Sequence, residues 1–180
     1  MGRLIYLVGA PGAGKSTLMA RMTKKYLRTP HGGSVPHDSL VNPRTGDIVA
    51  GELGRQRGQF SGTDALAMNI ITKAIPWIGS CPYPLVLGEG ARLANMRFLN
   101  AAAHPNGGSR DVLVVHVEHD DTETWRAARS AQLGREQTEA WVKGRTTAAR
   151  NLAAAAQDAG HRVFRGHPDY LADILEPWFP

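Results

Sequence analysis

Continuous apolar runs at residues 4–8, 84–88 and 112–117 dominate the hydrophobic pattern of the chain. Runs of this length, rich in Val, Ile and Leu and without polar alternation, are typical of strands buried on both faces of a sheet. A shorter run at residues 162–164 predicts a last strand. Alternating strands and helices predict an α/β fold, a three-layer α/β/α sandwich around a mainly parallel sheet. The helices are expected at residues 17–26, 93–103, 122–134 (with Thr122 as a possible N-cap), 136–159 and 169–175.

The region between the first two apolar runs departs from this alternation. Breaker residues at 29–34 predict a loop, and residues 35–41 are a weak strand candidate interrupted by Pro36. A strong turn signal at residues 42–47 leads into a short return strand at 48–50. These features predict a small hairpin.

A polar, glycine-rich segment follows at residues 51–62 and fits neither a helical nor a strand period. Residues 63–75 then predict a helix that ends before Pro76. A basic loop with one aromatic residue, leading into a helix, is a natural substrate-binding segment, with a plain surface loop as the alternative. With the later Arg92, the expected acceptor-binding residues are Arg55, Arg57, Phe60, Ser61 and Asp64.

The first apolar run opens directly into a glycine-rich motif. Gly9, Gly14, Lys15 and Ser16 fill the spacing G-x-x-x-x-G-K-[ST] between the predicted strand and helix. Such a loop curls so that several N–H groups point at one anion, and the helix N-terminus adds partial positive charge. Lys15 can reach the β- and γ-phosphates, and the Ser16 hydroxyl can bind Mg²⁺. The motif predicts a site for a nucleoside triphosphate, expected to be ATP, with Mg²⁺.

Two further strand ends carry polar side chains, at residues 89–92 and 118–121. Ligands of parallel sheets bind at the carboxyl ends of strands, so we expect these ends to meet the phosphate-binding loop. Glu89 is placed to help hold Mg²⁺, or to act as a base; a helix N-terminal acid is the alternative. Arg92 lies one turn into the next helix and can clamp an acceptor or a phosphate.

Asp38 and Asp64 are the candidates for accepting the proton of an attacking hydroxyl group. Asp38, in the weak strand candidate, is the preferred base, with a turn-forming acid as its alternative. Asp64 can equally be the N-cap of its helix. The sequence does not decide between the two.

Arg126 and Arg129 lie three residues apart, on one face of the helix predicted at residues 122–134. With basic residues further along, they can close over the triphosphate as a lid, and a solvated helix face is the alternative. We expect a single domain over residues 1–180, with the acceptor-binding insert at about 51–64 and the lid region at about 122–150. The additional members of the basic belt are Lys143, Arg145 and Arg150.

The composition of the chain indicates an anionic ligand and a reducing compartment. The chain has 21 basic and 16 acidic residues, a net charge of +5 that suits ligands from nucleotides to nucleic acid. No apolar run reaches the length of a membrane span, and the start of the chain leaves no room for a signal peptide. Cys81 is the single cysteine, so no internal disulfide forms. We expect a cytoplasmic protein without a membrane partner.

The phosphate-binding motif, the G-E-G-A-R strand end at residues 88–92 and the arginine-bearing helix after the third strand resemble the P-loop kinases, which include the nucleoside, nucleotide and shikimate kinases. The resemblance implies catalytic roles for Lys15 and Glu89, lid contacts of Arg126 and Arg129 with the phosphates, and a nucleobase near His167 and Pro168. The insert matches none of the acceptor sites familiar in these kinases. The ATP-binding set implied by the resemblance is Gly9, Gly12, Ala13, Gly14, Lys15, Ser16, Thr17 and Arg126, with Ser16 and Glu89 toward the metal.

The insert, with R-Q-R-G-Q-F-S-G-T-D-A-L from Arg55, and W-V-K-G-R at residues 141–145 resemble small kinases encoded by tailed phages of actinobacteria. Some phage P-loop kinases phosphorylate 5-hydroxymethyluracil within DNA. This resemblance implies a role in phage DNA modification, in the host cytoplasm.

The leading hypothesis is an ATP-dependent phosphotransferase that moves the γ-phosphoryl group of ATP·Mg²⁺ to a nucleoside- or nucleotide-type acceptor. A 5-hydroxymethyl pyrimidine in phage DNA and a free nucleotide or small metabolite are the two acceptor classes. A small P-loop ATPase without an acceptor is the second hypothesis, and a nucleotide-binding module without catalysis is the third.

Overall fold

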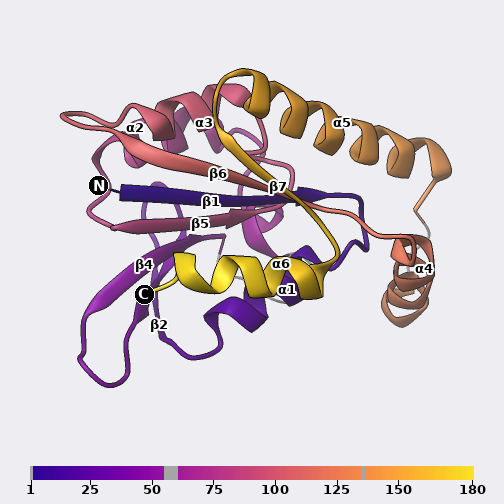
Figure 1. Cartoon of the computed structure of the whole chain (residues 1–180), viewed down its shortest axis with the longest axis horizontal. Helices are drawn as coiled ribbons and strands as arrows, with labels where there is room; N and C mark the ends of the chain where they lie inside the picture. The colour runs from indigo at the N-terminus through magenta and orange to yellow at the C-terminus, as the bar shows by residue number, and fades with distance from the viewer. Residues whose placement is uncertain (1, 55–60, 135–136) are drawn as a thin grey trace.

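A seven-stranded sheet, in the order β2-β3-β4-β5-β1-β6-β7, forms the middle layer of the protein (Figure 1). The computed structural model describes residues 2–54, 61–134 and 137–180. Neighbouring strands from β4 to β7 run parallel, whereas β3 is antiparallel to both β2 and β4. The strands are β1 (Gly2–Gly9), β2 (Leu27–His31), β3 (His37–Val41), β4 (Ile48–Leu53), β5 (Leu85–Glu89), β6 (Arg110–Val117) and β7 (Arg162–Gly166).

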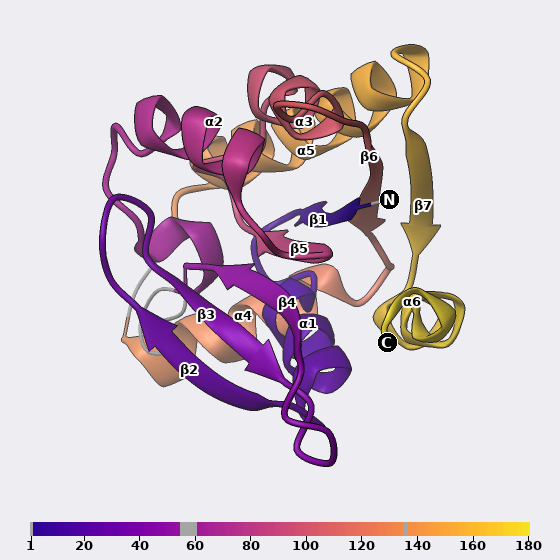
Figure 2. The same cartoon turned by 90° about the vertical axis from the view of Figure 1, so that its left-hand side faces the viewer.

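Helices cover both faces of this sheet. Helices α2, α3 and α5 lie over one face and α1 and α6 over the other, while α4 lies beyond the carboxyl ends of β1 and β6 (Figures 1 and 2). The helices are α1 (Lys15–Thr23), α2 (Ile71–Ser80), α3 (Met96–Ala103), α4 (Thr122–Leu133), α5 (Glu139–Asp158) and α6 (Pro168–Leu175), with short 3₁₀ helices η1 (Gly62–Ala65) and η2 (Glu176–Trp178).

Alternation along the central strand β1 builds two separate cores, because successive side chains of a strand point to opposite faces. Leu4, Tyr6 and Val8 belong to the core under α2, α3 and α5. Ile5 and Leu7 belong to the core under α1 and α6. The predicted three-layer α/β sandwich is therefore confirmed, and β1, β5 and β6 coincide with the three apolar runs.

The loop predicted at residues 29–34 was wrong for residues 29–31, which belong to the strand at residues 27–31. This strand is β2, at the edge of the sheet, paired with β3. Pro30 is tolerated there because an edge strand leaves half of its backbone groups outside the ladder. The hairpin prediction for the following residues is confirmed by β3 and β4, but β4 continues to Leu53, so Glu52 lies in a strand and not in a loop.

The helix predicted at residues 63–75 also differs. Residues Gly62–Ala65 form η1, and α2 starts only at Ile71 and continues through Pro76. The buried side chains of Ala74 and Ile78 hold α2 on the core despite the backbone donor that proline lacks. At α4, Thr122 is the first helical residue, and Asp121 occupies the N-cap position.

Among the described residues, no helix combines the length and the apolar character needed to cross a membrane.

Candidate active site

A cleft of about 840 Å³ opens at the carboxyl ends of β1 and β5. The phosphate-binding loop, the end of β5, η1, α4 and α5 contribute to its walls. Two of the three polar strand ends, those at residues 9–16 and 89–92, meet there as expected, whereas the described lining includes none of residues 118–121. The charged and hydroxyl side chains that line it include Lys15, Ser16, Asp64, Glu89, Arg92 and Arg126.

The phosphate-binding loop joins β1 to α1. The Lys15 ammonium donates hydrogen bonds to the carbonyl oxygens of Gly9, at 3.1 Å, and Ala10, at 2.8 Å, so it lies inside the curve of the loop. The first-turn N–H groups of α1 have no partner within the helix and face the same space. An ammonium beside a helix N-terminus is an environment that favours a polyphosphate. Of the predicted ATP-binding set, Ala13 alone is buried in the core beneath the loop, and the others line the cleft.

Helix α4 lies directly on this loop. A Cβ atom built on Gly12 would lie 2.7 Å from the Cα of Arg126, and one built on Gly14 would lie 3.0 Å from a ring carbon of Trp125 and 3.0 Å from Cγ of Pro168. Gly12 also has a φ of +83°, which a side chain disfavours. Both glycines therefore allow α4 and the start of α6 to approach the loop backbone.

Two side chains with oxygen ligands suited to Mg²⁺ lie next to each other, Ser16 at the start of α1 and Glu89 at the end of β5. The Ser16 hydroxyl donates a 2.8 Å hydrogen bond to the carboxylate of Glu89, which is buried at the end of β5. Ser61 Oγ lies 2.7 Å from Ser16 Oγ on the other side. Magnesium prefers oxygen ligands and commonly combines one or two protein groups with substrate phosphates and water. Ser16 and Glu89 fit that requirement.

A hydrogen-bond network fixes the end of β5 against η1. The Thr63 hydroxyl donates to the Glu89 carbonyl at 2.8 Å, and the buried Tyr6 hydroxyl donates to the Gly90 carbonyl at 3.1 Å. Burial raises the pKa of Tyr6, so its hydroxyl stays a donor. An Asp64 carboxylate oxygen accepts the Ala91 N–H at 2.8 Å. Asp64 is thus held beside Glu89, in the wall of the cleft, and does not cap a following α-helix.

Comparison with known protein families decides the class of site. The family model P-loop Nucleotide Kinase3 matches residues 1–178. The chain belongs to this family. No curated protein matched the chain. The seven-stranded α/β fold is accordingly the P-loop NTPase fold, and the cleft lies at the loop that carries the phosphate-binding motif.

In this member of the P-loop nucleotide kinase family, Arg126 lies on α4, next to Gly12 of the phosphate-binding loop. Its guanidinium makes a two-point ion pair with Glu123, one turn earlier. This hydrogen-bonded pair raises the pKa of Arg126 and lowers the pKa of Glu123. Because Glu123 is largely exposed, Arg126 can leave this ion pair and bind a phosphate at a small cost in free energy.

Asp38 is not brought to the cleft. It is buried on β3, where it accepts a 3.1 Å hydrogen bond from Arg28, and β4 and β5 lie between β3 and β1 in the sheet. The sequence predicted Asp38 in a weak strand candidate, near the end of that strand if Pro36 cuts it short. Asp38 is instead the second residue of β3 and is not among the described residues that line the cleft.

Several predicted acceptor residues fall on parts of the chain outside this description. Arg55, Arg57 and Phe60 lie outside the described residues, and so does the side chain of Arg129. Ser61, Asp64 and Arg92 do line the cleft. The Arg92 guanidinium contacts the Asp64 carbonyl and the sulfur of Met68.

Two tryptophans of the site, Trp125 and Trp141, carried no predicted role. Trp125 lies between the phosphate loop and two histidines, with ring centroids 4.3 Å from His119 and 5.8 Å from His167. Trp141 lines the cleft from the first turn of α5 and is 44% exposed. Trp125 directly precedes the predicted lid residue Arg126 in the sequence. This proximity was the signal that could have indicated a role for Trp125 in the site.

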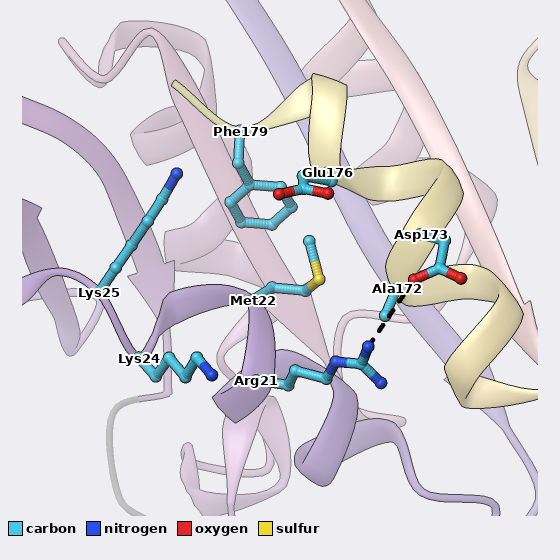
Figure 3. A pocket seen from close by; sticks show the side chains of 8 residues that line it. All are labelled: Arg21, Met22, Lys24, Lys25, Ala172, Asp173, Glu176 and Phe179. Carbon is cyan, nitrogen blue, oxygen red and sulfur yellow. Dashed lines mark ion pairs between the residues drawn. The ribbon is translucent and has the colours of Figure 1, made fainter.

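A second, smaller cavity of about 220 Å³ lies at the opposite end of α1, against α6 (Figure 3). Met22 and Phe179 line it between charged side chains, and Arg21 pairs there with Asp173 at 3.7 Å. Lys24 and Lys25 extend at its rim (Figure 3). Because this end of α1 is remote from the phosphate loop, its lysines serve as controls for Lys15.

Proposed function

We propose that the protein transfers the γ-phosphoryl group of ATP·Mg²⁺ to a nucleoside- or nucleotide-type acceptor. The Ser16–Glu89 hydrogen bond carries this proposal, because it joins the phosphate loop to the strand end that faces Asp64 and Arg92. One cleft therefore holds groups for a triphosphate on one side and for an acceptor on the other. A P-loop kinase requires both.

The nucleotide side uses the residues around the loop. Lys15 and the loop N–H groups bind the phosphates, and Ser16 and Glu89 bind Mg²⁺, which neutralises phosphate charge when bound. Arg126 exchanges its Glu123 partner for a phosphate oxygen, with Arg129 as the second arginine of the lid over residues 122–150. The nucleobase lies toward Trp125 and His167, which cluster beside the loop with Pro168.

The acceptor side uses the insert and the end of β5. Arg92 and Ser61 hold the acceptor, together with Arg55, Arg57 and Phe60. Asp64 takes the role of general base, since it lines the cleft and Asp38 does not. The acceptor oxygen attacks the γ-phosphorus in line, the bond from that phosphorus to the ADP oxygen breaks, and the acceptor proton passes to the Asp64 carboxylate.

A 5-hydroxymethyl pyrimidine within DNA is one acceptor class, and the net charge of +5 suits the phosphate backbone of DNA. The basic side chains Arg92, Arg126 and Arg145 all line the same cleft, where a phosphate backbone can approach them. A free nucleotide is the second acceptor class, and the family's description as nucleotide kinases favours it.

The test is phosphoryl transfer from γ-labelled ATP with Mg²⁺, offering nucleosides, nucleotides, and DNA with and without hydroxymethyl pyrimidines. We expect label in an acceptor. Label in DNA identifies the base kinase, label in a small molecule identifies the metabolic kinase, and free phosphate alone overturns the proposal in favour of an ATPase. Lys15→Ala should abolish transfer while the fold is retained, and Lys24→Ala, at the far end of α1, should leave it intact.

A further inference from the structure

Trp141 is a large aromatic side chain whose position folding does not explain. It belongs to neither hydrophobic core, although the core under α2, α3 and α5 includes Ala149, Leu152 and Ala153 of the same helix. Its side chain is 44% exposed and lines the cleft of the candidate active site. A tryptophan held in a ligand cleft without core contacts is typical of a binding contact, because aromatic side chains provide large rigid contact areas.

The local structure holds Trp141 in place. Thr138 caps α5, and its hydroxyl accepts a hydrogen bond from the backbone N–H of Trp141. The Arg145 guanidinium, one turn later, lies over the Trp141 ring at 5.5 Å from the centroid. Arg145 also lines the cleft, so a cation accompanies the aromatic surface. A flat ring beside a guanidinium suits a planar ligand that carries negative charge.

The two tryptophans of the cleft come from different helices. Trp125, on α4, lies against Gly14 of the phosphate loop, whereas Trp141 lines the cleft from α5. Met68 is 85% exposed in the same cleft. Because the proposed nucleobase position is at Trp125 and His167, Trp141 is the tryptophan left for the acceptor.

We propose that Trp141 and Arg145 form a stacking platform for the planar base of the phosphoryl acceptor. The platform rests on the proposed function, since it deepens the acceptor site of that reaction. A free nucleotide and a base within DNA present the same flat, phosphate-linked chemistry to these side chains. The platform therefore recognises the base of either, and the experiment distinguishes the two sources.

Direct binding tests the platform without turnover. Thymidine monophosphate is titrated calorimetrically, and a labelled oligonucleotide with 5-hydroxymethyluracil is titrated by anisotropy. Loss of one base–aromatic stack should weaken the binding of the correct probe to Trp141→Ala by about tenfold, while Trp141→Phe stays within about threefold of the wild type. Tyr170→Ala removes an aromatic residue that is 57% exposed and lies outside the cleft lining, and it should change nothing. The probe that responds identifies the source of the base.

Steady-state kinetics separates this proposal from the proposed function. In Trp141→Ala, the acceptor KM should rise about tenfold while the KM for ATP is unchanged. A wild-type enzyme that binds a probe through Trp141 but transfers no phosphate would overturn the proposed function and leave the platform standing. Equal probe affinities in Trp141→Ala and the wild type, or binding of neither probe to the wild type, would overturn the platform.

Discussion

The hydroxyl of Ser16 lies 2.8 Å from the carboxylate of Glu89, although 73 residues separate them in the sequence. The parallel pairing of β1 with β5 creates this contact, because it sets Leu7 beside Glu89 and brings both strand ends to one edge of the sheet. The Glu89 carboxylate is thereby fixed next to the loop that is predicted to bind phosphate. Its position is determined by backbone register, which makes the pair a rigid part of the site.

Replacing Glu89 by glutamine should reduce kcat about a hundredfold, because the variant keeps the shape but loses the negative charge directed at Mg²⁺. The Mg²⁺ concentration required for half-maximal rate should rise as well. Both are measured by labelled-ATP transfer over a Mg²⁺ titration. Glu118→Gln, at the end of the next strand and outside the cleft lining, is the matched control. An unchanged rate in Glu89→Gln would show that Glu89 does not contribute to Mg²⁺ binding.

Gly12→Ala should weaken ATP binding by about tenfold or more, because the new methyl group would lie 2.7 Å from the α4 backbone at Arg126. Gly107→Ala is a matched control, since Gly107 has a φ of +84° like the +83° of Gly12, but no atom lies within 4 Å of its added Cβ. Both variants should lose about 1–2 kcal/mol of unfolding free energy from left-handed strain. ATP affinity is measured by calorimetry. Equal ATP affinities in the two variants would contradict the contact between α4 and the loop.

The elements that the sequence predicted well are those with a one-dimensional signal. Buried parallel strands are apolar at every position, so β1, β5 and β6 are visible as continuous runs. The phosphate loop is defined by contiguous residues, and Glu89 follows its strand directly. Their convergence required only the rule that parallel strands end at one edge.

The elements that the sequence missed depend on partners far along the chain. β2 is mostly exposed, so it has no apolar pattern and is defined by its pairing with β3. Asp38 resembled a strand-end acid, but β3 pairs with β2, and this pairing brings Asp38 to Arg28. Trp141 gained its meaning only when α5 was placed beside the cleft. Such relationships are set by sheet order and helix docking, which local patterns do not encode.

Arg28 should be essential for stability. It bonds to Asp38 at 3.1 Å and to Glu52 at 2.6 Å, and both carboxylates are buried. Arg28→Ala would remove a shared cation from two buried acids, so we expect a loss of about 3 kcal/mol of unfolding free energy. Urea denaturation measures the loss. Arg44→Ala, in the exposed turn between β3 and β4, should have little effect, and a similarly small loss in Arg28→Ala would show that this cluster is dispensable.

Stability should fall as the pH drops below about 6.5, because burial lowers the pKa of His116 from its ordinary value of 6.5, despite an opposing effect of Glu118. The unfolded chain then binds a proton that the folded chain refuses, and one such proton gives a slope of at most about 1.4 kcal/mol per pH unit. The loss starts as pH falls through 6.5 and ends below the folded pKa. Urea denaturation from pH 8 to 5 should show a shallower slope in His116→Gln. An unchanged slope would exclude this histidine as the source.

Tyr6→Phe should cost about 1–3 kcal/mol of unfolding free energy, because it removes a buried hydroxyl that lies 3.1 Å from the Gly90 carbonyl and 3.0 Å from Thr63 Oγ1. These contacts tie η1 to the end of β5, where Glu89 and Asp64 are held. We therefore expect a reduced kcat for transfer with an unchanged ATP affinity, since the phosphate loop lies on the other side of Glu89. Tyr170→Phe removes an exposed hydroxyl and is the control. A stability loss with full kcat would mean that the network supports the fold without positioning the acids.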